Sequence, residues 1–143
     1  MQWNYNAEDY KEMEFKPIAP GKYRVRIETV EETTSRTNKP MLKITLAVSG
    51  ESSRIWYYLL LDSSTPQFIQ WTNNKLGRIY DSFDIPAGSM NTSEWEGKVG
   101  GALIDNETDN NGTLRARLKY FLKREEVLTL PFWNEGKDDV VPF

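Results

Sequence analysis

One segment of the chain, Ser53–Leu61, is rich in the aromatic and branched residues that are typical of β-strands. Side chains alternate across a strand, so inward packing of Tyr57 would turn Arg54, Trp56 and Tyr58 outward together. Flat rings stack on unpaired nucleic-acid bases at about 1 to 3 kcal/mol each, and nearby cations attract phosphates. The pattern therefore favours binding of a single nucleic-acid strand with weak sequence preference.

Further cations are predicted on the solvent side of the neighbouring strands and in one connecting loop. They come from the outward rows of the first, second and fifth predicted strands and from the loop between the first two. The candidate nucleic-acid-binding residues are Arg24, Arg26, Arg36, Lys39, Lys43, Arg54, Trp56, Tyr58, Arg115, Arg117, Lys119 and Phe121.

Each of these residues also has a plainer interpretation. Outward Lys and Arg side chains often only solubilise a strand or protect a sheet edge from pairing. For Trp56 and Tyr58 the alternative is burial under the helix or the N-terminal arm. A slip of one residue in register would exchange both of them for Tyr57.

The sequence contains no cysteine and no histidine, which removes disulfides, thiolate nucleophiles, imidazole bases and most zinc sites. Carboxylates remain, but no pair of them converges by its spacing, so carbohydrate binding or hydrolysis is a weaker alternative. The acids of the loop from Asp105 to Gly112 lack the calcium-loop pattern and argue against phosphate contact at the loop tip. We therefore expect a protein that is not an enzyme, with no catalytic residues, no cofactor and no metal.

Charge is distributed unevenly over the 143 residues, whose net charge is −3. Residues 1–15 and 125–143 are both acidic, whereas residues 16–124 hold 16 Lys and Arg against 12 Asp and Glu. A mildly basic body with acidic ends is compatible with a nucleic-acid partner, because the distribution of charge sets the local field. The sequence has neither a long apolar run nor a charged-then-apolar leader, so we expect no membrane span, no secretory signal and a cytoplasmic location.

The hydrophobic pattern predicts five strands and one helix. Thr65 and Pro66 match a helix N-cap followed by proline at the first helical position, and apolar residues then recur at helical spacing as far as Phe83. Trp95 is expected to cover the core, and Asn111-Gly112 marks a turn before the last strand. The predicted strands are Lys22–Glu31, Met41–Val48, Ser53–Leu61, Gly97–Ile104 and Thr113–Lys123.

Alternation also predicts which residues of the first and fifth strands face the core. In the first strand these are Tyr23, Val25, Ile27 and Thr29. In the fifth they are Leu114, Ala116, Leu118 and Tyr120, which leaves Phe121 facing outward.

Three strands, one helix and two strands follow one another in the order of an OB-fold. The expected fold class is therefore all-β with one helix: a five-stranded antiparallel Greek-key barrel with the helix between strands 3 and 4. A small antiparallel sandwich with a packed helix is the alternative. We expect residues 1–16 to form an N-terminal arm that docks by its aromatic side chains, 17–130 the binding domain and 131–143 an acidic C-terminal tail.

The chain ends in two acids followed by an apolar tip. A partner would need only an apolar pocket for the terminal ring and a basic residue for the α-carboxylate. The candidate partner-binding residues are Asp138, Asp139, Val140, Val141, Pro142 and Phe143.

This ending resembles the acidic, Pro-Phe-terminated tail of bacterial and bacteriophage single-stranded DNA-binding proteins. Over the body, Glu96-Gly97-Lys98-Val99 is similar to the glycine-lysine start of the fourth strand in that family. The longer helix, the aromatic N-terminal arm and the near absence of a Gly/Gln-rich linker depart from the cellular bacterial pattern. They suggest a phage-type member and put the tetrameric assembly of the cellular proteins in doubt.

The resemblance implies a protein that coats and protects single-stranded DNA during replication and recombination. It also implies recruitment of replication and recombination proteins through the tail, and a location in the host cytoplasm for a phage-encoded chain. The alternative is a phage structural or protein-interaction module that binds no nucleic acid. Either protein could form a homo-oligomer.

Overall fold

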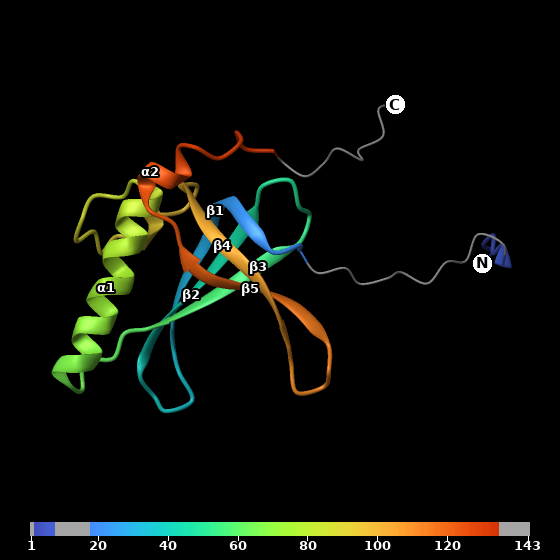
Figure 1. The fold of residues 1–143 in the computed structure, drawn as a ribbon. Coiled ribbons are helices and arrows are strands. Elements are labelled where there is room, and N and C mark those ends of the chain that lie inside the picture. The colour runs from blue at the N-terminus through green and yellow to red at the C-terminus, as the bar shows by residue number, and fades with distance from the viewer. Residues whose placement is uncertain (1, 8–17, 135–143) are drawn as a thin grey trace.

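The computed structural model describes residues 2–7 and 18–134, which include one antiparallel sheet with a long helix beside it (Figure 1). The strands are β1 (Gly21–Thr34), β2 (Pro40–Val48), β3 (Arg54–Leu60), β4 (Val99–Thr108) and β5 (Leu114–Phe121). The helices are α1 (Pro66–Phe83), the 3-10 turn η2 (Thr92–Glu94) and the single-turn α2 (Arg124–Val127). The prediction of a mostly β chain with a helix between the third and fourth strands is confirmed; α2 and η2 were not predicted.

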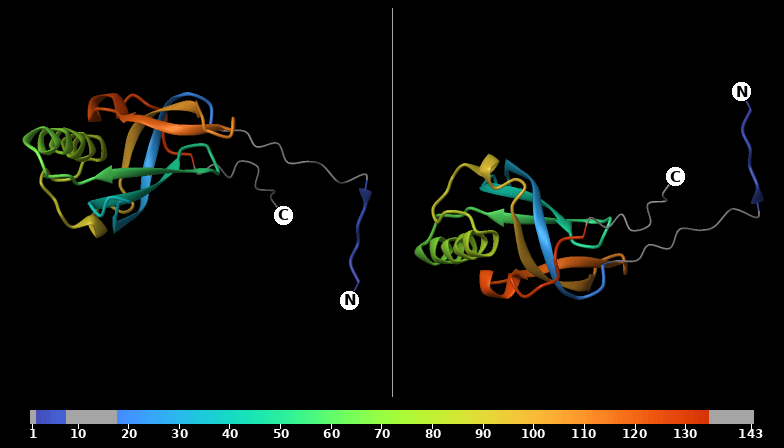
Figure 2. Two further views of the ribbon diagram at one scale, coloured as in Figure 1. Left: turned by 90° about the horizontal axis from the view of Figure 1, so that it is seen from below. Right: turned by 90° about the horizontal axis from the view of Figure 1, so that it is seen from above.

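The sheet has the strand order β3-β2-β1-β4-β5, so β1 is central and β3 and β5 are the edges. β1 pairs with β4 over Gly21–Arg26 and with β2 over Val25–Thr34. Because its two halves pair mainly with different strands, the sheet curls, and the view in Figure 2 shows the curl with α1 at one side. The edges meet through side chains, with the rings of Tyr57 and Phe121 centred 5.1 Å apart in an edge-to-face arrangement.

The core lies inside the curl, and α1 closes one side of it. Ile79 and Phe83 of α1 are buried against the sheet, and Trp95 is buried as the sequence predicted. The predicted N-cap is also confirmed, since the Thr65 side chain accepts a hydrogen bond from the Phe68 amide at 3.2 Å. The helix ends at Asp84, which adopts the left-handed conformation with φ 55°.

Two bulges change the predicted alternation in β1 and β5. In β1 the register shifts between Ile27 and Thr29, so Thr29 is exposed and Val30 packs against the core in its place. In β5 the shift lies opposite Leu103 and Ile104 of β4. Beyond it Phe121 is only 4% exposed while Tyr120 is 47% exposed, so the prediction of an inward Tyr120 and an outward Phe121 is wrong.

The described parts of the two ends differ from each other. Trp3 and Tyr5 are largely exposed, which contradicts docking of the arm by these two rings; Tyr10 and Phe15 lie outside the described residues. At the other end, the Asn134 amide donates to Ser49 Oγ at 2.9 Å, and its carbonyl accepts from the Gly50 amide at 2.8 Å. Among residues 2–7 and 18–134, no helix is long and apolar enough to cross a membrane.

α1 can pack closely against β4 because residue 100 is a glycine and has no Cβ. A Cβ there would lie 2.8 Å from the Phe83 ring and 2.9 Å from Ser82 Oγ, whereas a Cβ at Gly77 of α1 would meet nothing within 4 Å. We expect Gly100→Ala to lower the free energy of unfolding by about 1 to 3 kcal/mol through over-packing. Gly77→Ala should raise it by about 0.5 to 1 kcal/mol, because alanine favours the helix.

Urea unfolding of the two variants measures both effects as shifts of the midpoint at constant slope. Equal shifts of the same sign would contradict the packing of Gly100 against Phe83.

Candidate nucleic-acid interface

A groove of about 520 Å³ runs between the edge strands β3 and β5. Arg54, Trp56 and Tyr58 line it from β3, and Arg115 and Arg117 line it from β5. We call it the seam groove. It brings together five of the residues that the sequence singled out, although they come from opposite edges of the sheet.

The two rings of β3 are held outward by the burial of their neighbours. Ile55 and Leu59 are buried and Tyr57 is half-buried, as the alternation predicted, while Trp56 is 53% and Tyr58 55% exposed. Burial of Tyr57 also raises the pKa of its phenol. The groove wall is therefore a rigid strand with two accessible rings.

Lys43 extends this wall onto β2. It pairs in register with Tyr58, and no carboxylate forms an ion pair with it among the described residues. A cation therefore lies beside an exposed ring on the solvent side of the sheet.

The arginines that line the seam groove are each held by an acid. Arg115 Nε lies 2.8 Å from Asp109 Oδ2, Arg117 pairs with Glu107, and Arg54 Nε lies 2.9 Å from Glu28. The hydrogen bond from Arg115, together with backbone amides of the turn, lowers the pKa of the Asp109 carboxyl. The sequence predicted that the acids of the β4–β5 hairpin oppose phosphate contact at the loop tip. In the structure these acids also pair with Arg115 and Arg117, and so reduce the positive charge along β5.

Arg24 and Arg26 do not line the seam groove. Arg24 donates to the Leu130 carbonyl at 3.3 Å and lies 5.8 Å from the centre of the Phe132 ring, and Arg26 lies 4.7 Å from the centre of the Trp133 ring. The residues that follow the short helix α2 thus lie against Arg24 and Arg26 of β1. Arg24 and Arg26 are therefore partly covered, whereas Lys22 of the same row is exposed, and the contact of Arg24 and Arg26 with nucleic acid stays a prediction.

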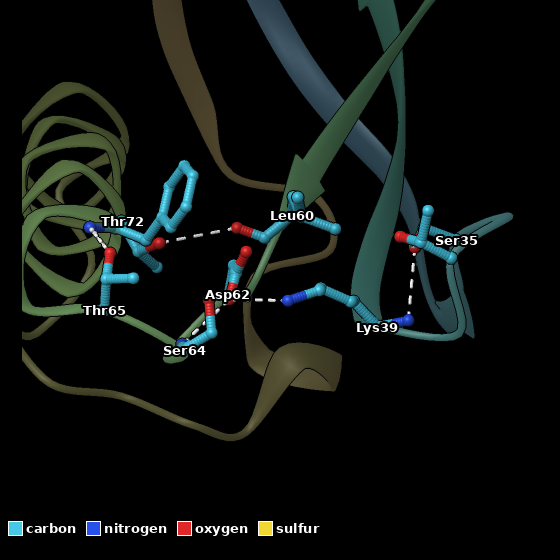
Figure 3. Close-up of polar contacts among 9 residues, drawn as sticks. Ser35, Lys39, Leu60, Asp62, Ser64, Thr65 and Thr72 are labelled. Carbon is cyan, nitrogen blue, oxygen red and sulfur yellow. Dashed lines mark hydrogen bonds and ion pairs between the residues drawn. The ribbon is translucent and has the colours of Figure 1, made fainter.

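The β1–β2 turn carries Arg36 and Lys39, of which only Arg36 projects freely into solvent. Lys39 Nζ lies 3.2 Å from the buried Asp62 carboxylate, which also accepts the Ser64 amide at 2.8 Å (Figure 3). Hydrogen bonds from Ser64 and the contact with Lys39 lower the pKa of Asp62. Lys39 therefore ties the turn to the connection between β3 and α1.

A second groove, of about 360 Å³, lies between α1 and the end of β5. Lys119, which the sequence had singled out, lines this groove. Three further lining residues were not predicted: Tyr120 on β5, and Lys75 and Arg78 on α1. Tyr120 was missed because of the bulge. The spacing of Lys75 and Arg78 on one helix face was the only available signal for the other two.

Phe121 contributes to this second groove as part of its floor, not as an outward ring. No group of three or more acidic side chains that could hold a metal ion occurs within the described ranges. The partner-binding residues 138–143 lie outside those ranges.

Comparison of the sequence with protein-family models and with curated proteins finds no match.

The lowered pKa of Asp62 gives a test of the network in Figure 3. A carboxyl with a lowered folded-state pKa stabilises the fold at neutral pH, and this contribution is lost as the pH falls. We expect Asp62→Asn to lower the free energy of unfolding at pH 7. The difference from the unchanged protein should shrink as the pH falls through 3.8 towards the lower folded-state value.

The measurement is urea unfolding at several pH values, with the exposed Glu32→Gln as the control. A difference that stays constant down to pH 2 would show that Asp62 does not act through its charge.

Proposed function

We propose that this protein binds single-stranded DNA without catalysing a reaction, using the seam groove as its primary site. The observation that carries the proposal is the exposure of Trp56 and Tyr58 along a groove whose opposite wall is Arg115 and Arg117. Bases would stack on the two rings while the arginines follow the phosphates.

We propose further that the curled sheet is an OB-type Greek-key barrel. The strand order β3-β2-β1-β4-β5, the approach of β3 to β5 and the helix between β3 and β4 support it. In such barrels the face of the second and third strands is the usual surface for oligonucleotides. Trp56, Tyr58 and Lys43 lie on that face.

The ion pairs of the groove set the electrostatic mechanism. Exposed arginine–carboxylate pairs contribute only about 0 to 1 kcal/mol each, so a phosphate can replace the carboxylate at small cost. Arg115 and Arg117 would exchange Asp109 and Glu107 for phosphate oxygens as the strand enters. Because binding also releases counterions, the affinity would fall steeply with salt.

The biological role that fits this site is coating and protection of single-stranded DNA during replication and recombination. We propose that residues 138–143 recruit partner proteins. The ending of the sequence supports membership in the single-stranded DNA-binding protein family, in a phage-type form.

Substitution of the two rings tests the primary site. We expect Trp56→Ala and Tyr58→Ala each to weaken binding of oligo-dT by about 1 to 3 kcal/mol, because each removes one stacking surface. Trp3→Ala, which removes an exposed ring outside the groove, is the matched control and should leave affinity unchanged. Fluorescence titration at several salt concentrations measures all three; equal losses in all variants would contradict the assignment of the groove.

Removal of residues 138–143 tests whether DNA binding is independent of the segment proposed to recruit partner proteins. The truncated chain lacks acids that compete with phosphate, so its affinity for oligo-dT should be equal or slightly higher. The same titration measures it. A large loss of affinity would place the tail in the binding site and contradict this division of roles.

A protein-interaction module is the second candidate, favoured by exposed rings outside the seam groove. Phe68 and Trp71 on α1 are 38% and 48% exposed and contact each other edge-on with centres 5.3 Å apart. Tryptophan emission that oligo-dT does not change, together with self-association in sedimentation, would favour this candidate.

A further inference from the structure

We propose that the bound strand continues from the seam groove into the groove between α1 and β5, where it meets a second set of phosphate and base contacts. We call this second site the helix groove and define it by Asn74, Lys75, Arg78, Lys119 and Tyr120. The inference rests on the proposed binding of single-stranded DNA and extends it to residues on the helix.

The two grooves follow one another along β5 and lie on opposite faces of β3. On β3, Tyr57 borders the helix groove while its neighbours Trp56 and Tyr58 border the seam groove. On β5, Arg115 and Arg117 line the seam groove, and the following residues line the helix groove. From Arg115 to Tyr120, β5 covers roughly 17 Å at about 3.3 Å per residue, so one extended nucleic-acid strand that runs along β5 can follow both grooves.

Charge favours the helix groove for phosphate. The arginines of the seam groove are each paired with an acid, but none of the described residues that line the helix groove is acidic. No ion pair involves Lys75, Arg78 or Lys119 within the described ranges. Three uncompensated cations therefore converge on one depression.

Acids close to the helix groove in sequence or in lining have hydrogen-bond or ion-pair partners of their own. Asp81, three residues after Arg78 on α1, accepts the Arg124 amide at 3.0 Å. Asp105 and Glu107 share a depression over β4 with Lys119. Asp105 accepts the Asn106 amide at 2.8 Å, and Glu107 is paired with Arg117. The positive charge of the helix groove is thus left for a ligand.

The hydrogen-bonding groups of the helix groove are mainly donors. Arg78 uses one N–H on the Phe121 carbonyl at 3.4 Å, and a guanidinium carries five. The Asn74 carbonyl oxygen accepts from Gln70 at 3.0 Å, which leaves the Asn74 amide N–H groups available. Donors without competing acids fit phosphate oxygens.

Tyr120 supplies a ring for a base beside these donors. The bulge in β5 turns Tyr120 outward and buries Phe121, whose ring lies edge-to-face against Tyr57 and Phe83 with centres 5.1 and 5.4 Å apart. Both residues line the helix groove, Tyr120 with an exposed ring and Phe121 with a buried one. A bulge that re-aims one side chain is a common device next to binding sites.

The test compares two double variants of equal charge. Lys75→Gln/Lys119→Gln removes two cations of the helix groove, and Lys22→Gln/Lys98→Gln removes two exposed lysines that line neither groove. Each is titrated with oligo-dT of about 4 and about 16 nucleotides, which span the range of site sizes of OB domains.

For the longer oligonucleotide, the slope of log affinity against log salt should fall by about 1.4 in the helix-groove variant, since each lost contact with a single strand removes about 0.7. At 0.1 M salt this corresponds to a roughly 25-fold loss of affinity. The shorter oligonucleotide should bind with unchanged affinity, because it is held at Trp56 and Tyr58. The control variant should change neither.

Tyr120 gives an independent readout. Tyr120→Ala should weaken binding of the longer oligonucleotide by roughly fivefold or more, and Tyr120→Phe, which keeps the ring, should not.

The outcomes separate this inference from the proposed function. Equal slopes for the two double variants, or equal weakening of both oligonucleotides, would overturn the second set of contacts while the seam groove stands. Failure of the unchanged protein to bind either oligonucleotide would instead overturn the proposed function.

Discussion

The curl of the sheet about β1 is the constraint on which the rest of the structure depends. β1 pairs with β4 at its beginning and with β2 over the remainder, so the two hairpins leave it in different directions. This arrangement brings β3 towards β5, although the two strands are the opposite edges of the hydrogen-bonded order. A flat sheet with the same sequence would place the rings of β3 and the cations of β5 far apart. The groove between the edge strands therefore results from the backbone pairing. Only this pairing brings the side chains of β3 and β5 together along one groove.

Electrostatic compensation decides which cations of the surface remain available. Arg54, Arg115 and Arg117 each have an acidic partner, and Arg24 is covered by the segment that follows α2. Such exposed pairs are weak, so they tune the affinity of a site more than they stabilise the fold. A strand that entered the seam groove would have to displace carboxylates, whereas cations at the junction of α1 and β5 would meet phosphate directly. The two grooves would thus differ in salt dependence for a physical reason.

The sequence predicted the parts of the fold and site that depend on local patterns. Alternation in β3 placed Trp56 and Tyr58 outward, and the Thr65 cap with Pro66 set the start of α1. Bulges have no comparable signal in one sequence, because a single extra residue reverses the faces beyond it, as it does at Tyr120. The sequence also did not predict that Leu130 and Phe132 lie against Arg24. This contact depends on α2, and a helix of one turn is too short to show a helical period in the sequence. Long-range packing, and not local secondary-structure propensity, determined the orientation of Tyr120 and the covering of Arg24.

Aromatic residues of this chain occupy two environments, which differ in how much each ring stabilises the fold. Tyr57, Phe83 and Phe121 pack edge-to-face inside the curl, where burial of a large apolar side chain contributes about 1.5 to 3 kcal/mol. Trp56 and Tyr58 flank Tyr57 on the same strand but are half-exposed and forgo much of that contribution. Under the proposed function, the two exposed rings and the neighbouring cations would meet a ligand with flat faces and negative charge, and single-stranded DNA combines both properties.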